Sequence, residues 1–238
     1  MKGQKILIGL GILIGAGYIL LLVLKTSGIF FWYRNPTTAN EPAIKQEKLI
    51  FASNLKEPSR ADFIVFKNRY SDSIEVGGDI EKIKIKSYLS RLCALPGDII
   101  EMKNGVLFVN GQNFDQSLIL KAYYRTTVDE LNKSDYNFEQ LEDNTNTDST
   151  KTIRINLDTK EMLTLKKQIK LERIIKSDTS SAFQWLSPKT NYTSDNFGPI
   201  KIPNNCYFVL GDNRHQSADS RFIGFIEKKD CTGVVINQ

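Results

Sequence analysis

The feature that most constrains this chain is an uncharged apolar run near its N-terminus, residues 6–24. As an α-helix rising about 1.5 Å per residue, this run spans roughly 28 Å, close to the hydrocarbon thickness of a bilayer. Lysines flank it on both sides, and the aromatic segment 29–33 that follows suits a membrane interface. The run is longer than the apolar part of most signal peptides, and no small-x-small cleavage site follows it. We therefore expect residues 1–34 to form a retained membrane anchor, with a transmembrane helix over about 6–24.

Composition excludes several classes of protein. The chain has 32 Lys plus Arg against 27 Asp plus Glu, a net charge of +5, which is too mild and too mixed to indicate nucleic-acid binding. Three cysteines cannot support a disulfide-dense scaffold, and there is no Cys-x-x-Cys pair. The single histidine, His215, excludes a multi-histidine metal site. We expect no nucleic-acid partner, no metal and no other cofactor.

The pattern after the anchor predicts a spacer and then a mainly β domain. Residues 35–42 contain two prolines and no apolar periodicity, so they are interpreted as a spacer. The domain is expected over 43–238. Its strand signals are buried runs at 63–66 and 206–210, an alternating segment at 80–85, and a hairpin of 99–102 with 106–109 around the turn Asn104-Gly105.

The middle of the chain differs from both flanks. Residues from 126 to about 180 are polar, and we interpret them as an insertion, or cap, within the β domain. Within it, 142–148 is predicted to be an exposed loop. The segment 159–169 is predicted to be a short helix, because apolar residues recur there at spacings of three and four.

Three motifs in order carry a family resemblance. The stretch 211–221, GDNRHQSADSR, follows a predicted buried strand and alone would be a polar turn. Its order resembles the G-D-N-R-x-x-S-x-D-S-R box of type I signal peptidases. Upstream, 87–98, SYLSRLCALPGD, is similar to that family's Y-x-K-R-x-x-G-L-P-G-D box. The segment 195–203, DNFGPIKIP, leads into the last box as in several bacterial members.

The resemblance implies a fold, a location and a substrate. The fold would be a signal peptidase I-like, mainly β domain with an inserted cap behind one transmembrane helix. The protein would be a single-pass protein of the inner (cytoplasmic) membrane, with its domain on the extracytoplasmic side. Its partners would be the lipid bilayer and the signal peptides of exported preproteins. The extended segment before a cleavage site would bind by strand addition, with shallow pockets that select small residues.

The same resemblance implies a serine nucleophile and a lysine base, and here the sequence departs from the family. The family's nucleophile lies in S-M-x-P-T-L-x-x-G-D, nine residues before the Asp, and counting back from Asp62 gives Ser53. The residues around Ser53 do not match this motif. The lysine position, fixed by the adjacent Arg91, is occupied by Ser90. A hydroxyl cannot act as the general base for another hydroxyl, because only a group such as a desolvated lysine takes up the proton.

The remaining residues of the boxes are expected to support the site. By resemblance, Ser217 would accept a hydrogen bond from the missing lysine, while Asp219 and Arg221 brace its loop; Arg91 and Asp212 belong to the same boxes. Other bases are poor substitutes. Lys84 and Lys86 lie on the strand before Ser90, and Lys86 is roughly 13 Å away along it. Lys56 is expected to be solvated and protonated. His215 is interpreted as a satisfied or exposed loop histidine.

Two functions from different classes therefore remain. The first is a signal peptidase homologue that has lost catalysis and acts by binding peptides, partner proteins or an active paralogue. The second is an active signal peptidase that uses Ser53 with a base the sequence does not reveal. A purely structural anchor protein would leave the boxes unexplained. The substitution at Ser90 and the altered surroundings of Ser53 favour the first.

Overall fold

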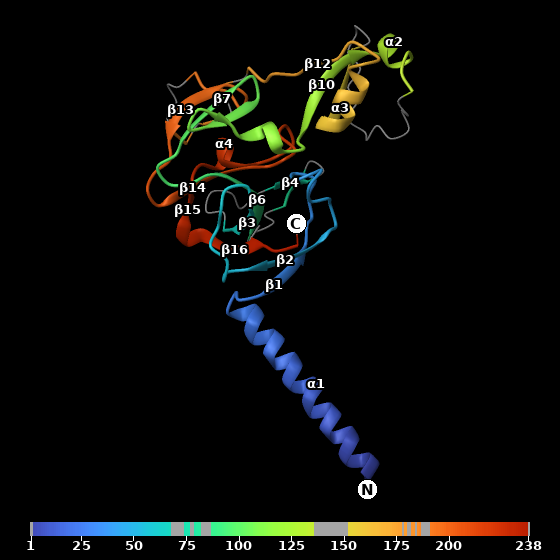
Figure 1. The fold of residues 1–238 in the computed structure, drawn as a ribbon, viewed down its shortest axis with the longest axis vertical. Coiled ribbons are helices and arrows are strands. Elements are labelled where there is room, and N and C mark those ends of the chain that lie inside the picture. The colour runs from blue at the N-terminus through green and yellow to red at the C-terminus, as the bar shows by residue number, and fades with distance from the viewer. Residues whose placement is uncertain are drawn as a thin grey trace.

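The computed structural model describes residues 2–67, 74–76, 79–81, 87–135, 152–177, 179, 182–183, 185–186 and 191–237. A single long helix, α1 (Lys2–Thr26), projects from a β-rich body (Figure 1). Its segment Ile6–Thr26 has a mean hydropathy of 2.7, and none of it is buried against the protein. Twenty-one helical residues span about 31 Å, so α1 is long and apolar enough to cross a membrane.

The body is built around one seven-stranded sheet. Its strand order is β1-β2-β16-β3-β6-β14-β15, and every neighbouring pair is antiparallel. The strands are β1 (Phe31–Arg34), β2 (Leu49–Ser53), β3 (Phe63–Phe66), β6 (Tyr88–Ala94), β14 (Cys206–Leu210), β15 (Ile226–Glu227) and β16 (Cys231–Val235). The strands predicted at 63–66 and 206–210 are thus confirmed.

A four-stranded sheet packs beside the first, in the order β13-β7-β8-β9. Its strands are β7 (Ile99–Lys103), β8 (Val106–Val109), β9 (Gln112–Asn113) and β13 (Phe197–Lys201). The predicted β7–β8 hairpin is confirmed: Asn104 and Gly105 both have positive φ, as a two-residue hairpin turn of this sequence requires. The 3₁₀ turn η1 (Phe114–Ser117) follows β9.

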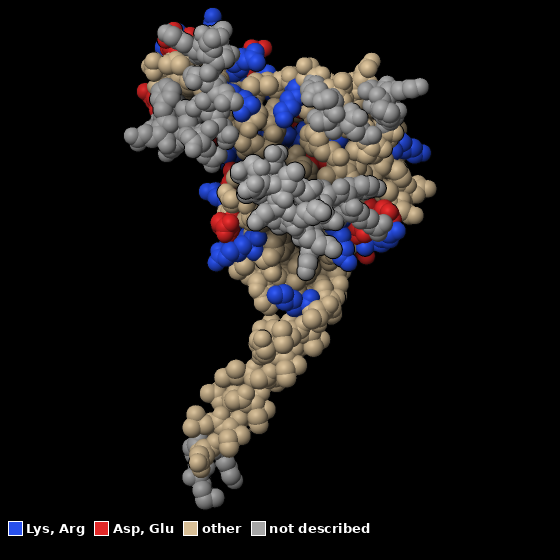
Figure 2. Space-filling view, turned by 180° about the vertical axis from the view of Figure 1, so that it is seen from behind, with Lys and Arg blue, Asp and Glu red and all other residues tan. Residues whose placement is uncertain are grey.

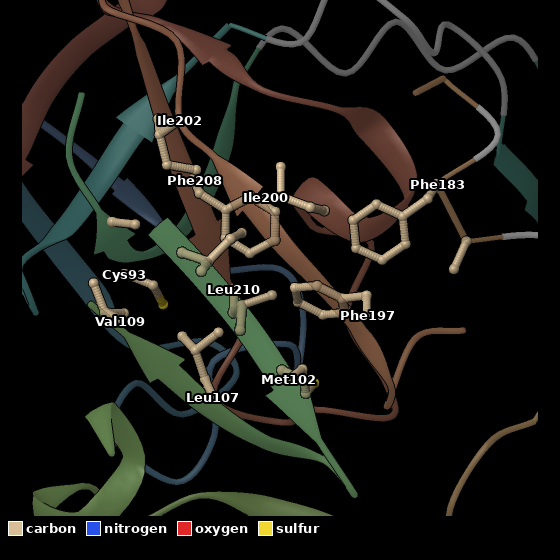
Figure 3. Packing of buried hydrophobic residues seen from close by; sticks show 13 residues of the cluster. Cys93, Met102, Leu107, Val109, Phe183, Phe197, Ile200, Ile202, Phe208 and Leu210 are labelled. Atoms are coloured by element: carbon tan, nitrogen blue, oxygen red, sulfur yellow. The ribbon is translucent and has the colours of Figure 1, made fainter. Parts of the chain in front are cut away.

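The two sheets enclose the largest apolar core. Figure 3 shows its side chains converging from β6, β7, β8, β13 and β14, with Phe197, Phe208 and Met102 among them. Cys93 lies in this core, and burial raises the pKa of its thiol to about 12. Such a thiol stays protonated and unreactive, so Cys93 acts as a small apolar residue of the core.

A small sheet, β11-β10-β12, lies at the far end of the body from α1 (Figure 1). It consists of β10 (Lys121–Thr127), β11 (Thr152–Asp158) and β12 (Glu172–Arg173). Two short helices, α2 (Val128–Leu131) and α3 (Thr159–Leu165), cover its apolar face. Helix α3 begins at a capping box formed by Asp158 and Glu161.

Helix α3 ends four residues earlier than predicted. The sequence predicts a helix over 159–169, whereas the last helical residue is Leu165 and a turn follows. Ile169 is nevertheless buried in the core of the small sheet. Its apolar side chain therefore serves packing and does not indicate that the helix continues to residue 169. The predicted loop 142–148 lies outside the described residues, and of the alternating segment 80–85 only the first two residues are described, in β5 (Asp79–Glu81), which pairs with β4 (Ile74–Val76).

The segment between α1 and β2 is packed into the domain. Asn35 and Asn40, in the stretch interpreted as a spacer, are fully buried. The side-chain amide of Asn35 donates to the carbonyls of Thr37 and Lys45, at 2.8 and 3.0 Å. The remaining elements are helix α4 (Ser220–Ile223) and the 3₁₀ turn η3 (Lys228–Asp230).

Candidate functional site

Ser90, at the expected lysine position, lies in the middle of the seven-stranded sheet. It sits on β6 opposite Ile64 of β3, and its side chain is buried. Its hydroxyl donates to the carbonyl of the preceding residue, Leu89, at 2.8 Å. That bond uses the hydroxyl proton locally. The Ser90 hydroxyl is thus engaged by the backbone next to it.

Ser53, the residue matched to the nucleophile by counting, lies in the same sheet but far from Ser90. The register runs from Ser53 to Val234, from Val234 to Ile64, and from Ile64 to Ser90, so these four are successive partners across four strands. Adjacent strands lie about 4.8 Å apart, which separates the two serines by roughly 14 Å. A hydroxyl at that distance cannot exchange a proton with a group at position 90.

The hydroxyl of Ser53 has a local structural role instead. It donates to the carbonyl of Ile29 at 2.5 Å and accepts the backbone N–H of Leu55 at 3.2 Å. These bonds join the end of β2 to the connection between α1 and β1. The structure thus does not bring together the two serines that the sequence comparison singled out.

A different segment, residues 38–41, contacts the residue before Ser90. The carbonyl of Ala39 accepts the N–H of Asn213 at 3.0 Å, and the side-chain amide of Asn40 donates to the carbonyl of Leu89 at 2.8 Å. The other atom of that amide, Asn40 Oδ1, is buried and has no hydrogen-bond partner among the described residues. Sequence reasoning missed this segment, although Ala39-Asn40-Glu41-Pro42 keeps the proline spacing of S-M-x-P.

A lysine also lies beside this segment, but it is paired. Lys121 Nζ is 3.0 Å from Glu41 Oε2, and both side chains are largely buried. The backbone of Lys121 bonds to that of Asp212 and Arg214. The amine of Lys121 is therefore engaged by the carboxylate of Glu41 and not directed at a hydroxyl of the site. Neither residue of this ion pair was singled out from the sequence.

Ser217 lies against the same segment. Its Oγ is buried and has no hydrogen-bond partner in the part of the chain that the structure describes. A Cβ at Gly211 would come within 2.2 Å of that oxygen and 2.5 Å of the carbonyl of Ala39, so only glycine fits at position 211. The loop 211–217 and the segment 38–41 are therefore in direct contact. The family resemblance predicts that the Ser217 hydroxyl accepts a hydrogen bond from a lysine, but no described lysine donates one.

Arg91 and Asp212 form a buried two-pronged ion pair beside Ser90. Arg91 Nε and Nη2 donate to the two oxygens of Asp212 at 2.7 and 2.6 Å. Arg91 Nη1 donates to the carbonyl of Ala61 at 2.7 Å. Parallel bonds of this kind fix geometry as well as charge. The pair ties β6 to the turn that follows β14.

Asp219 and Arg221 form a second buried pair, which braces the loop from within. Arg221 Nε and Nη2 donate to Asp219 at 2.8 and 2.7 Å, and Nη2 also donates to the carbonyl of Arg214 at 2.6 Å. Asp219 Oδ2 accepts the N–H of Gly211 at 3.1 Å. Both side chains are fully buried.

His215 is held in one tautomer by its neighbours. Its Nδ1 accepts the N–H of Tyr123 at 2.8 Å, so Nε2 carries the proton and donates to Asp195 at 3.0 Å. The ring also stacks on Tyr123, and burial lowers the pKa of His215 against the opposing pull of Asp195. The residue is a satisfied, neutral histidine that joins the loop 211–217 to β10. Among the described residues, no cluster of three or more His, Cys, Asp or Glu could hold a metal ion.

Comparison with known proteins identifies the family. The family model described as "Signal peptidase, peptidase S26" matches residues 9–237. Signal peptidase I P of Bacillus subtilis subsp. natto is 31% identical over 164 residues, which cover 68% of this chain and 55% of that protein. Signal peptidase I of Streptococcus pneumoniae is 25% identical over 221 residues, 92% of this chain and 87% of that protein.

The extent of these matches varies among the relatives. The chain spans about half the length of the Bacillus subtilis relatives, covering 55% and 48% of two of them. A crystal structure of a signal peptidase I from Enterococcus faecalis aligns with a TM-score of 0.34 and 21% identity, covering 76% of this chain and 98% of that one. Because the family model matches nearly the whole sequence, this chain belongs to the signal peptidase family, peptidase S26.

Proposed function

We propose that this protein is a membrane-anchored member of the signal peptidase family that has lost catalysis and acts by binding. The observation that carries the proposal is that segment 38–41 contacts both Leu89, the residue before Ser90, and the loop that carries Ser217. Ala39 is the residue of segment 38–41 that stands at the serine of S-M-x-P, and its carbonyl touches the loop that carries Ser217. We assign the nucleophile's position to Ala39 rather than to Ser53. Both reactive groups of the family are then replaced.

The frame around these two positions supports binding of an extended peptide. Strand β6 pairs with β3 from Tyr88 onward, but β14 joins its other side only from Arg91. The first residues of β6 therefore have an edge that no described strand covers, directly beside Ser90. An added strand would use that edge and would replace the side-chain bond from Asn40 to Leu89. The ligand we propose is a signal peptide of an exported preprotein, presented at the extracytoplasmic face of the inner membrane.

The two halves of this proposal are tested separately. Purified full-length protein is incubated with a preprotein, and cleavage is compared with that of Ser53→Ala, Ser90→Ala and Ser217→Ala variants. We expect wild type to cleave no faster than any of them, because no described base lies beside a described hydroxyl in the site. Robust cleavage by wild type that one of these variants abolishes would show that an active dyad exists.

The assignment of Ala39 has its own test. The double variant Ala39→Ser/Ser90→Lys would place a hydroxyl and an amine in adjoining segments, with Ser217 Oγ as an acceptor for the amine. We expect it to cleave faster than either single variant; Ser90→Lys alone is the matched control, because it supplies the amine while leaving Ser53 as the candidate nucleophile. Binding is measured with a fluorescent signal peptide; failure of wild type to bind it would remove the binding half of the proposal.

A further inference from the structure

A groove of about 680 Å³ lies where helix α1 meets the sheet. The end of the helix forms one wall, from Lys25 to Gly28, and strand β1 forms another. Val65 and Thr232 of the sheet also line it. None of the contacts described at the candidate site uses this groove. It is larger than two other cavities of the domain, of about 260 and 290 Å³.

Among the described residues, the charged side chains that line the groove are two cations. They are Lys25 and Arg34, and none of the described lining residues is a carboxylate. Lys25 Nζ lies 4.9 Å from the centre of the Trp32 ring, and a single bond from Arg34 Nη1 goes to the carbonyl of Glu47 at 3.2 Å. Most donors of the Arg34 guanidinium are therefore uncommitted to the described protein. The electrostatic character of the groove favours an anion.

The carbonyls at the end of α1 do not oppose an anion. A helix C-terminus carries partial negative charge on unpaired carbonyls. Here the hydroxyls of Thr26 and Ser27 donate back to the carbonyls of Leu22, Val23 and Leu24, and the backbone N–H groups of residues 27, 28 and 30 bond to the same turn. These bonds satisfy the terminal carbonyls within the helix.

The helix also sets the level at which the groove lies relative to the membrane. If Ile6–Thr26 spans the hydrocarbon, the groove begins at the residue where the hydrocarbon ends. Figure 2 shows basic side chains at this level, where the uncharged helix joins the body. Phospholipid headgroups occupy the next several ångströms of a bilayer. They are thus present at the groove at a far higher concentration than any soluble ligand.

We propose that this groove binds the headgroup of an anionic phospholipid, with the lipid phosphate between Lys25 and Arg34. Trp32 lies at the depth typical of interfacial aromatics. Cations at this depth are attracted to anionic lipid, and each strengthens the association. The headgroup fixes the rotation of the body above the membrane, which sets how the β6 edge faces an emerging peptide.

The test uses the full-length protein in nanodiscs of phosphatidylcholine with increasing phosphatidylglycerol. Trp32 fluorescence should change and saturate as phosphatidylglycerol is added, and the change should be absent in Trp32→Phe. In the Lys25→Gln/Arg34→Gln variant, the half-saturating fraction of phosphatidylglycerol should rise on the order of ten- to thirty-fold. The matched control is Lys166→Gln/Lys167→Gln, which removes the same charge from exposed positions after α3 and should titrate like wild type.

Two further arms identify the source of the anion. Soluble glycerol phosphate at the same total phosphate concentration should leave Trp32 fluorescence unchanged, which supports a lipid-borne headgroup. An equal titration by the Lys25→Gln/Arg34→Gln variant and wild type would overturn the site. Saturation of the Trp32 signal by an acidic peptide in pure phosphatidylcholine would overturn the lipid assignment in favour of a peptide groove. None of these readouts depends on peptide cleavage, so the proposal stands or falls apart from the function proposed above.

Discussion

At the scale of single residues, His215 decides how the stability of the site depends on pH. Its Nδ1 accepts a backbone N–H and its Nε2–H bonds to Asp195, so the neutral ring is the form that fits. Burial lowers the pKa of His215 below its ordinary value, and the cations Arg221 and Lys176 act in the same direction against Asp195. Protonation would place a donor opposite the N–H of Tyr123.

This arrangement predicts that the folded state loses stability as pH falls below about 6.5, the pKa of an unfolded histidine. Since the folded pKa is lower, the unfolded state binds the proton first, and the contribution of His215 is full above 6.5. Below that value the free energy of unfolding should fall by up to about 1.4 kcal/mol per pH unit. Urea unfolding between pH 7.5 and 5 measures the slope.

The chain has one histidine, which makes the control direct. His215→Gln should show a smaller slope over the same range, whatever its stability at pH 7.5. The pKa of Asp195 is held below its ordinary value by the bond to His215, despite burial, so Asp195 contributes only at lower pH. Equal slopes for wild type and His215→Gln would show that the ring is not held neutral in the folded protein.

At the scale of secondary structure, the local sequence predicted where the strands lie better than it predicted which strands pair in the sheet. The runs at 63–66 and 206–210 are strands as predicted, because apolar β-branched and aromatic residues occupy both faces of each. Ser53 shows what local spacing cannot predict, namely the order of strands in the sheet. It ends β2, nine residues before Asp62, yet β16 separates β2 from β3 in the sheet. Strand β16 comes from the C-terminal end of the chain, so no local count could show that insertion.

The candidate site was also only partly predictable from the sequence. The boxes around Arg91 and Asp219 keep their sequence order, and their paired side chains lie buried together. The segment 38–41 retains only a proline spacing, because its contacts to Leu89 and Asn213 use a backbone carbonyl and a side-chain amide. Backbone contacts impose little on residue identity. The approach of Lys121 to Glu41 likewise depends on how the small sheet packs.

The pair of Arg91 and Asp212 joins two elements and should dominate the stability of this region. Removing Arg91 leaves a buried carboxylate without its partner, which typically costs about 3–5 kcal/mol. We expect Arg91→Ala to lower the free energy of unfolding by that amount in denaturant titration. Lys103→Ala removes an ion pair to Glu101 whose side chains are 62% and 34% exposed, and should cost less than about 1 kcal/mol.

A double variant separates the charge from the packing. Arg91→Met/Asp212→Leu removes both charges together, so it should be more stable than Arg91→Ala. If Arg91→Ala costs no more than Lys103→Ala, the pair does not tie β6 to the turn after β14 in solution.

At the scale of the whole molecule, the three parts lie in a line. Helix α1 is at one end, the seven-stranded sheet is in the middle, and the small sheet is at the far end (Figure 1). The Ser90 site and the groove beside α1 both belong to the middle part, so the membrane and the site are close together. A peptide that emerges from the bilayer next to α1 would reach the β6 edge without crossing the small sheet.

This arrangement is useful only if the body lies on the side where exported segments emerge. We therefore predict that α1 is retained in the mature protein and that the body from about Ala43 onward is extracytoplasmic. Flanking charge does not decide the direction, because lysines lie at both ends of the apolar run. Family membership supports it. Protease added to intact spheroplasts should digest the body, while a cytoplasmic marker protein stays intact. Protection of the body until the spheroplasts are lysed would reverse the topology and place both the peptide edge and the lipid groove on the cytoplasmic face.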